Sequence, residues 1–457
     1  MLSLAIINLI FSSLGVAEAI QCRCTYHDAC WPTAEDFADL QRQVSQSLIH
    51  PFPPAKPCYV NASSADCAAV ANGWTDGNWR ANQPGAMEIP NFETFTFQNG
   101  TIDACYVNLS LGVPCTQGSV PPVGVDVLTV GDVQAAIIFA AKHNLRLVVK
   151  NTGHDFLGRS TGRGSFVIWT HHLKNITIHP VLHPAGAPLT EEYDHGVDNV
   201  VEISLVTSTG AYLTANAHQH ANLFWALRGG GGGTYGVVTS VTYRTRLLVP
   251  VIATSLIMEA PVFQSNSSLG KAFTELVRIT PTLTDAGWGG YNLVQPTNGN
   301  TSFTLVLILP NVSWAEANAT INPYLDYVRA LVSTSSIDDP LTISDASTIP
   351  FSSFYAWYDT LFSGSGGVGG NIALGSWLLP RDCLERDYEA VSETLINASF
   401  FNYYLVAGGA VSRTNASSTG LNPAWRKANA HAILGVTWPE GTTAEEINRL
   451  HTAGIRD

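Results

Sequence analysis

Charged side chains are scarce in this chain, and positive ones more so than negative ones. Only 13% of the 457 residues are charged, with 23 Lys and Arg against 36 Asp and Glu. A net charge of −13 without any basic run argues against nucleic acids and anionic membranes as partners. Hydrophobic residues make up 46%, so the chain is expected to fold, and its length allows two or more domains.

Long hydrophobic runs are absent beyond the N-terminus. No later segment reaches the roughly 20 apolar residues that a membrane-spanning helix needs, so no membrane anchor is expected there. The chain begins with a short apolar run that ends in small residues, MLSLAIINLIFSSLGVAEAI. This pattern predicts a signal peptide over residues 1–19 and a secreted protein, with an anchoring helix as the alternative.

Cysteine is missing from the whole stretch between Cys115 and Cys383. The other cysteines crowd the N-terminal quarter and lack the paired spacing of metal sites; they are Cys22, Cys24, Cys30, Cys58, Cys67, Cys105 and Cys115. We therefore predict disulfide bonds formed in an oxidising compartment, with the pairing left open, and no metal site. Asn-x-Ser/Thr acceptor sites for glycosylation agree with secretion; they are Asn61, Asn99, Asn108, Asn175, Asn266, Asn300, Asn311, Asn318, Asn397 and Asn415.

A run of five glycines, Gly229–Gly233, lacks two features of nucleotide-binding loops. No Lys-Ser/Thr pair follows it to hold phosphate and magnesium, which argues against a nucleoside triphosphatase. The residues after it read as a strand and not as a helix, which argues against a Rossmann dinucleotide site.

Regular patterning is present in the middle of the chain. The spacing predicts a strand over 123–130, a helix over 132–143 and a strand over 145–150, which together form an α/β unit. A second block contains strands over 199–207, 211–214 and 237–243 with a short helix over 222–228. Alternating strands and helices after Pro250 predict a further domain, and a capping pattern at Thr33 and Asp36 predicts a helix over 36–48.

The loop that follows the predicted strand LVVK is rich in glycine and short polar residues. Glycines allow backbone N–H groups to surround an anion closely, and His154 lies in the middle of this loop. A turn histidine that is hydrogen-bonded to the backbone is the alternative interpretation of His154.

Several segments together resemble the fungal berberine-bridge-enzyme-like branch of FAD-linked oxidases. This branch belongs to the vanillyl-alcohol-oxidase fold group, whose flavin module is called a PCMH-type domain. The segments are CWPTAEDF, WTDGNWRANQPGA, VGDVQAAIIFAAKHNLRLVVKNTGHDFLGRSTG, SFVIWTHHL, NLFWALRGGGGGTYGVVTSVTYRT and NPAWRKA.

The resemblance implies an α+β fold in three parts. A Cys-rich N-terminal segment over 20–119 precedes a PCMH-type FAD-binding domain of two α/β subdomains over 120–248. A second α/β domain with an antiparallel sheet, over 249–457, would bind the substrate. Relative to the family pattern, the chain is expected to be shortened near 180–198 and to lack the C-terminal segment that closes over the flavin.

The resemblance also implies which residues bind FAD. His154 would bond the flavin 8α-methyl group, and no cysteine stands where a second covalent link would form. The remaining cofactor-binding residues fall in the histidine loop and in the glycine-rich block; they are Lys150, Asn151, Thr152, Gly153, Asp155, Leu157, Gly158, Gly232, Gly233, Tyr235, Gly236, Val237 and Val238.

The implied reaction is oxidation of an alcohol or an activated C–H bond, with hydride transfer to flavin N5 and O₂ as the acceptor. Candidate bases are aromatic or acidic residues of the second domain; they are Tyr355, Tyr358, Asp359, and Tyr403 or its neighbour Tyr404. Few charges in that domain favour a small apolar or aromatic substrate. The resemblance also implies a role in secondary metabolism, and we expect a monomer. A secreted glycoprotein that keeps the scaffold without flavin is the alternative.

Overall fold

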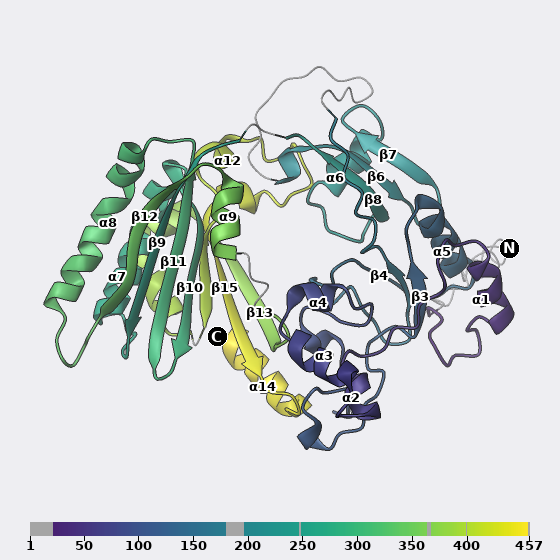
Figure 1. Ribbon diagram of the computed structural model, residues 1–457. Helices are drawn as coiled ribbons and strands as arrows, with labels where there is room; N and C mark the ends of the chain where they lie inside the picture. Colours follow the sequence, from purple (N-terminus) through teal and green to yellow (C-terminus); the bar gives the residue numbers. More distant parts are fainter. Residues whose placement is uncertain (1–21, 180–195, 246–247, 363–366, 399, 456–457) are drawn as a thin grey trace, which may run out of the picture.

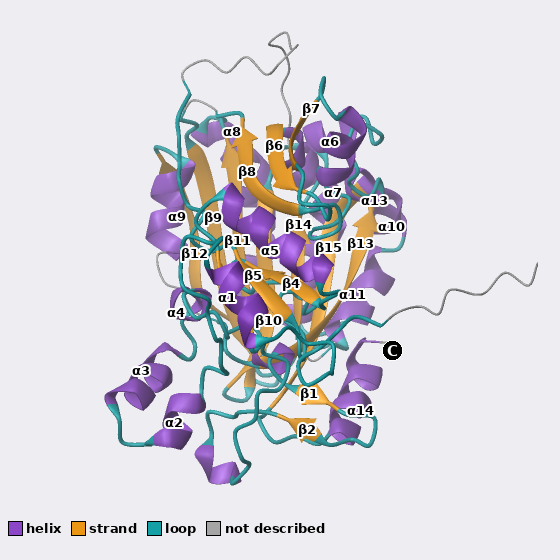
Figure 2. Cartoon of the chain, turned by 90° about the vertical axis from the view of Figure 1, so that its right-hand side faces the viewer, coloured by secondary structure: helices purple, strands orange, loops and turns teal. Residues whose placement is uncertain are grey.

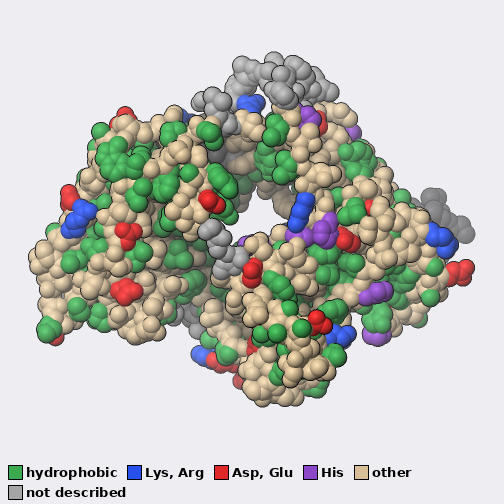
Figure 3. Space-filling model, in the orientation of Figure 1, with side chains coloured by type: hydrophobic (Ala, Val, Ile, Leu, Met, Phe, Trp, Pro, Cys, Tyr) green, Lys and Arg blue, Asp and Glu red, His purple; other side chains and the backbone are tan. Residues whose placement is uncertain are grey.

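The computed structural model describes residues 22–179, 196–245, 248–362, 367–398 and 400–455. Two halves face each other across an opening, with the large sheet on one side and two small sheets on the other (Figure 1). The space-filling view shows this opening between them (Figure 3). The predicted signal peptide and most of the shortened segment near 180–198 lie outside the described residues.

The N-terminal segment consists of short elements joined by loops. Its elements are α1 (Ala34–Gln41), α2 (Lys56–Val60), α3 (Ala65–Gly73), α4 (Gly77–Ala81), the 3₁₀ turns Pro90–Phe92 and Leu109–Leu111, and the hairpin of β1 (Phe95–Thr96) with β2 (Ile102–Asp103). Helix α1 begins at Ala34, directly after its capping residue Thr33. It ends at Gln41, whereas the sequence predicted a helix that continues to residue 48. The Gln41 side chain bonds the carbonyl of Gln46 and the N–H of Leu48, so it fixes a turn there.

Three disulfide bonds lie in this segment, each between cysteines that are close in sequence. The pairs are Cys24–Cys30, Cys58–Cys67 and Cys105–Cys115. Asp28 lies beside the first pair, but the joined sulfurs offer no thiolate to a metal ion. The bridges staple loops in a segment that has little core of its own.

The first small sheet carries the predicted α/β unit. Strands β3 (Val123–Asp126), β5 (Phe166–Trp169) and β4 (Leu147–Lys150) pair in parallel in that order, and α5 (Val130–Lys142) connects β3 to β4. The capping box of Thr129 and Asp132 starts α5, whose apolar side packs on the sheet. This packing fixes the end of β4, from which the histidine loop departs.

The second small sheet is antiparallel, in the order β7 (Tyr212–Asn216), β6 (Val200–Val206) and β8 (Val237–Tyr243). A 3₁₀ turn at Gly196–Asp198 precedes it, and α6 (Ala221–Leu227) packs against it. Its core is small, formed mainly by Ile203, Ala215 and Phe224.

The large sheet has seven antiparallel strands in the order β12-β9-β11-β10-β14-β15-β13. Their bounds are β9 (Val251–Ala260), β10 (Gly289–Thr297), β11 (Asn300–Pro310), β12 (Thr342–Phe351), β13 (Asn371–Pro380), β14 (Phe401–Leu405) and β15 (Ala428–Trp438). Viewed from the side of the small sheets, α5, β4 and β5 lie in front of these strands (Figure 2). The predicted α+β class with an antiparallel sheet in the second half is confirmed.

The two faces of the large sheet differ. One face packs on α7 (Ser268–Asp285), α8 (Trp314–Thr334) and α11 (Tyr388–Ile396), forming the largest core of the described residues. The other face is turned toward the small sheets and carries α9 (Phe354–Phe362) near one edge (Figure 1). The remaining helices are α10 (Arg381–Arg386), α12 (Gly409–Arg413), α13 (Ala424–Lys427) and α14 (Ala444–Ile455). Within the described residues, no helix combines the length and hydropathy needed to span a membrane.

A buried ion pair joins the two halves. Both guanidinium nitrogens Nη1 and Nη2 of Arg426, on α13, donate to the carboxylate of Asp198 at 2.6 and 2.7 Å. Both side chains are almost completely buried, so each charge depends on the other for the interactions it loses with water.

We expect Asp198→Ala to lower the free energy of unfolding by about 3–5 kcal/mol, because it leaves the Arg426 charge buried and unpaired. Asp326→Ala is the control, since it removes an exposed pair with Arg329 on α8 and should cost no more than about 0.5 kcal/mol. Urea unfolding followed by tryptophan fluorescence measures both. Equal urea midpoints for the two variants would contradict the role given to the buried pair.

Candidate functional site

The histidine loop leaves the end of β4 and returns to β5. Gly153 and Gly158 both adopt positive φ, +87° and +70°. A Cβ at Gly158 would lie 2.6 Å from the ring of Phe92, and one at Gly153 would lie 3.0 Å from the carbonyl oxygen of Ala86. The loop therefore needs glycine at both positions, for conformation and for space.

The first part of this loop has free backbone donors. Among the described residues, none accepts a hydrogen bond from the N–H groups of Thr152, Gly153 and His154. The side chains of Asn151, Thr152 and His154 are exposed, and the ring of His154 packs edge-on against Phe156 at 5.0 Å. Consecutive unpaired N–H groups beside a glycine form a cradle for an anionic group, which fits the pyrophosphate of a dinucleotide.

Arg159 connects the histidine loop to the glycine run. Its guanidinium pairs with the carboxylate of Asp155 at 2.6 Å and donates to the carbonyl of Gly232 at 3.3 Å. The hydrogen bonds from Arg159 lower the pKa of Asp155, so this carboxylate stays charged. The two sequence segments predicted to bind one cofactor thus lie side by side.

The other predicted cofactor residues occupy varied positions. Gly232, Gly233 and Tyr235 are exposed in the loop before β8, where Val237 is buried and Val238 points outward. Leu157 is 74% exposed on the histidine loop. Gly236 stands at φ +151°, and a Cβ there would lie 2.6 Å from the carbonyl of Val206, so the chain passes close to β6.

Lys150 differs from its predicted neighbours because its side chain turns inward. It is fully buried, with Nζ 3.5 Å from the carbonyl of Ala81, 3.3 Å from that of Asn151 and 5.4 Å from the centre of the Trp169 ring. Burial lowers the pKa of Lys150 to about 7, although nearby Glu88 and Glu93 oppose the shift. Its ammonium faces the N-terminal segment and not the open side of the loop.

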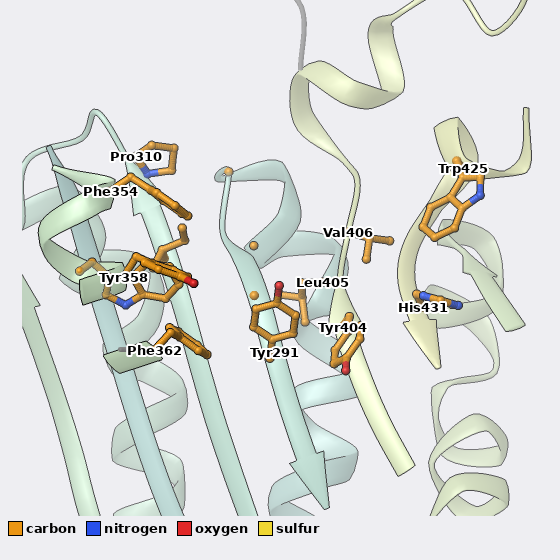
Figure 4. Close-up of a pocket in the computed structure, with 15 residues that line it drawn as sticks. Tyr291, Pro310, Phe354, Tyr358, Phe362, Tyr404, Leu405, Val406, Trp425 and His431 are labelled. Carbon is orange, nitrogen blue, oxygen red and sulfur yellow. The ribbon is translucent and has the colours of Figure 1, made fainter. Parts of the chain in front are cut away.

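A cavity of about 670 Å³ lies on the sheet face that is turned toward the small sheets. Aromatic rings form most of its wall, as Figure 4 shows. On α9 the rings of Phe354, Tyr358 and Phe362 are nearly parallel, with centres 6.4 and 5.9 Å apart in sequence order. Such a wall suits a flat, apolar molecule.

Opposite α9, three side chains form a row across neighbouring strands. Tyr291 on β10 pairs with Tyr404 on β14, which pairs with His431 on β15. The Tyr291 and Tyr404 rings meet edge-on at 4.8 Å, and Trp425 of α13 packs edge-on against His431 at 5.1 Å. Burial raises the pKa of Tyr404 and lowers that of His431, so both side chains are uncharged near pH 7.

The predicted bases lie in three different environments: the cavity, the protein surface and the core. Tyr358 lines the cavity, whereas Tyr355 and Asp359 are exposed on α9 and are not among the lining residues. Tyr403 requires a correction, because it is fully buried on the helix-covered face and its hydroxyl bonds Thr280 at 3.0 Å. The period of two along β14 puts its neighbour Tyr404 in the cavity instead.

His431 was not predicted from the sequence. It follows the NPAWRKA segment by three residues, in the strand ANAHAILGVTW, where apolar residues surround it. The sequence signal that could have found it is a histidine between the apolar residues of a strand. Only the register with β14 shows that it shares a face with Tyr404.

The histidine loop also contains the spacing Gly-x-Ser-x-Gly over Gly158–Gly162. In serine hydrolases this spacing forms a strand–turn–helix elbow that presents the serine. Here it lies in the loop between β4 and β5, and a strand, not a helix, follows it. The geometry does not favour a hydrolase.

Comparison with known proteins decides the family. An uncharacterized FAD-linked oxidoreductase of Arthroderma benhamiae is 33% identical over 524 aligned positions, which cover 99% of this chain and 87% of that protein. The chain belongs to the FAD-linked oxidoreductase family. FAD-linked oxidoreductase malF of Malbranchea aurantiaca is 26% identical, with coverages of 94% and 81%. No family model matches the chain.

Solved structures support the fold of this FAD-linked oxidoreductase. The VAO-type flavoprotein MtVAO713 of Myceliophthora thermophila C1 superposes with a TM-score of 0.78 at 23% identity, covering 95% of this chain and 86% of that one. The H104A variant of berberine bridge enzyme gives 0.59 at 12% identity, with coverages of 92% and 82%. The suspected vanillyl-alcohol-oxidase, berberine-bridge-enzyme-like family is confirmed.

The buried Lys150 predicts a pH-dependent stability. Between pH 7 and the ordinary value of 10.5, the unfolded chain holds a proton on Lys150 that the folded chain has released. Stability therefore rises with pH in this window, by up to about 1.4 kcal/mol per pH unit relative to a Lys150→Met variant, which cannot titrate. Urea titrations of both proteins at several pH values measure the difference. Parallel curves for the two proteins would show that Lys150 keeps an ordinary pKa.

Proposed function

We propose that this FAD-linked oxidoreductase is an oxidase that acts on a small apolar or aromatic molecule, an alcohol or an activated C–H compound, with O₂ as the acceptor. The observation that carries the proposal is the aromatic cavity on the sheet face turned toward the small sheets. A single polar row, which ends at His431, interrupts the otherwise apolar wall. Such a site orients an apolar substrate through one reacting group.

The histidine loop and the glycine run are the residues that would hold FAD. The free N–H groups of Thr152, Gly153 and His154 suit its pyrophosphate, and Gly232 and Gly233 leave space for its nucleotide end. The exposed imidazole of His154 is the candidate for a single covalent link to the flavin 8α-methyl group. Bound FAD would supply the acceptor for the substrate hydride and a route for its electrons to O₂.

His431 is our candidate for the base in this reaction. Because burial lowers its pKa, the imidazole is uncharged near pH 7 and can accept the substrate proton. Tyr404 stays protonated, since burial raises its pKa, so its hydroxyl can donate a hydrogen bond that orients the substrate oxygen. The rings of Phe354, Tyr358 and Phe362 would pack against the apolar part of the substrate and position it.

We also propose a secreted, glycosylated protein with a role in secondary metabolism. Three disulfide-bonded pairs support an oxidising compartment. The ten glycosylation sites support it as well, because nine of the asparagines are exposed and Asn318 is half-buried. We propose that the protein acts as a monomer.

A glycoprotein without flavin is the second candidate, and one observation favours it. Strand β8 exposes Val238, Val241 and Tyr243, at 39%, 38% and 56%. Apolar side chains in this domain therefore lack a covering layer among the described residues.

The state of the flavin separates these two functions. We expect the purified chain to absorb near 450 nm and to keep its flavin through acid denaturation. His154→Ala should lose the acid-stable flavin, because the proposed link is removed, while His218→Ala, an exposed histidine elsewhere, should retain it. Gel fluorescence and peptide masses measure the adduct. A colourless wild-type protein would support the glycoprotein instead.

Removal of the candidate base should slow turnover without removing the flavin. We expect His431→Asn to lower kcat/KM for aromatic primary alcohols by about 10²- to 10⁴-fold, with an unchanged visible spectrum. In the wild type the rate should fall at acidic pH, below the usual titration range of histidine, because only the uncharged imidazole accepts the proton.

The decrease in rate at acidic pH should be absent in His431→Asn. Tyr355→Phe is the matched control, because Tyr355 is exposed on α9 outside the cavity. A wild-type rate in His431→Asn would exclude His431 as the base.

A further inference from the structure

Glu88 belongs to a stretch of the N-terminal segment that packs against the base of the histidine loop. Its N–H donates to the carbonyl of Gly153 at 3.1 Å, and its own carbonyl accepts from the N–H of Gly369 at 3.1 Å. A Cβ at Gly153 would lie 3.2 Å from Cα of Met87, which shows how close the two backbones are. The backbone of Glu88 is thus fixed immediately beside the residue that precedes His154.

The Glu88 carboxylate has no strong partner in the described part of the chain. The residue is 5% exposed, and Oε2 is buried without a hydrogen bond. The two buried cations nearby are directed elsewhere. Arg80 pairs with Glu93 and donates to the carbonyl of Met87 at 2.6 Å, and Lys150 faces two carbonyls. A buried carboxylate in this position has unused capacity to accept a hydrogen bond.

Four charged or titratable groups act on the Glu88 carboxylate. His154, Arg80 and Lys150 favour its ionised form, and Asp76 opposes it. Burial is the larger effect and raises the pKa of Glu88, while His154 is the strongest of the three favourable charges. Of these partners, only His154 is exposed on the loop that would meet the flavin.

We infer that Glu88 is a positioning residue for His154, whose imidazole it holds through one ring nitrogen so that the other nitrogen faces the flavin. This inference rests on the proposed function, in which His154 links the flavin. The ring of His154 is exposed and packs on Phe156 alone among the aromatic rings of the described residues, so its rotation needs a further restraint. A carboxylate that accepts one imidazole N–H fixes both the ring orientation and the tautomer.

The test compares Glu88→Gln with two other carboxylate variants in the full chain. Glu393→Gln is an exposed control on α11, and Glu93→Gln removes a buried carboxylate that pairs with Arg80 beside the same loop. Flavin-free protein is mixed with FAD, and acid-stable flavin is followed with time. We expect Glu88→Gln to form the link at least about tenfold more slowly, with Glu88→Asp partly restored, at unchanged thermal midpoint.

A second readout needs no flavin. Diethyl pyrocarbonate modifies uncharged, accessible imidazoles, and peptide masses report the rate at His154. Because a hydrogen bond to Glu88 occupies one ring nitrogen of His154 and restrains the ring, Glu88→Gln should increase this rate about threefold, and Glu393→Gln should not.

The outcomes are distinct. The inference is overturned if Glu88→Gln links flavin and is modified at His154 at the wild-type rates. It is also overturned if Glu88→Gln slows flavin linking only as much as Glu93→Gln does and lowers the thermal midpoint, since that would be a general loss of structure. If the wild type forms no link, the proposed flavin attachment fails, and the modification rate alone decides whether Glu88 acts on His154.

Discussion

The site depends on one constraint, the clamp that residues 74–93 form between the two halves. Glu88 bonds the backbone of the histidine loop on one side and Gly369 on the other, and the Trp74 indole donates to the Gly369 carbonyl at 2.9 Å. Asn91 extends the same clamp, because its side-chain oxygen accepts from the N–H of Ile372, the second residue of β13. Because the proposed hydride transfer requires the reacting atoms within a few ångströms of each other, it needs a fixed distance between the histidine loop and the large sheet. An N-terminal segment of short helices and disulfides, which looks peripheral in the sequence, therefore sets the geometry of the centre.

Local signals in the sequence were sufficient for the α/β unit of the first small sheet. The predicted strand, helix and strand over 123–150 lie within thirty residues, and the structure has β3, α5 and β4 there, although β3 ends at Asp126 and α5 already begins at Val130. The histidine loop follows from the same short-range chemistry, since positive φ at Gly153 and Gly158 requires glycine. Strand pairing in the large sheet is non-local. β10, β12, β14 and β15 were not predicted, because their apolar runs do not show which strand lies beside which.

The base candidates show the same limit at the level of single residues. In FNYYL both tyrosines are aromatic, so the pattern cannot tell which one faces the core, and one step of register exchanges their surroundings. Lys150 illustrates a different limit. A lysine at the end of a strand is normally expected at the surface, and its burial follows from the N-terminal segment that covers it, which local sequence does not reveal. The residue types of the candidate site could be predicted from the sequence, whereas the face on which each side chain lies required the tertiary structure.

The free-energy cost of keeping the cavity open helps to distinguish an enzyme from an inactive scaffold. Aromatic rings that face an open space of about 670 Å³ leave apolar surface in contact with water, at about 25 cal/mol for each Å². The free N–H groups at Thr152, Gly153 and His154 add donors without protein acceptors in the described chain. A scaffold without ligands would be more stable with this space collapsed and these donors paired. The combination of positive-φ glycines, unpaired donors and an open aromatic wall is therefore explained better by a bound cofactor and substrate than by loss of function.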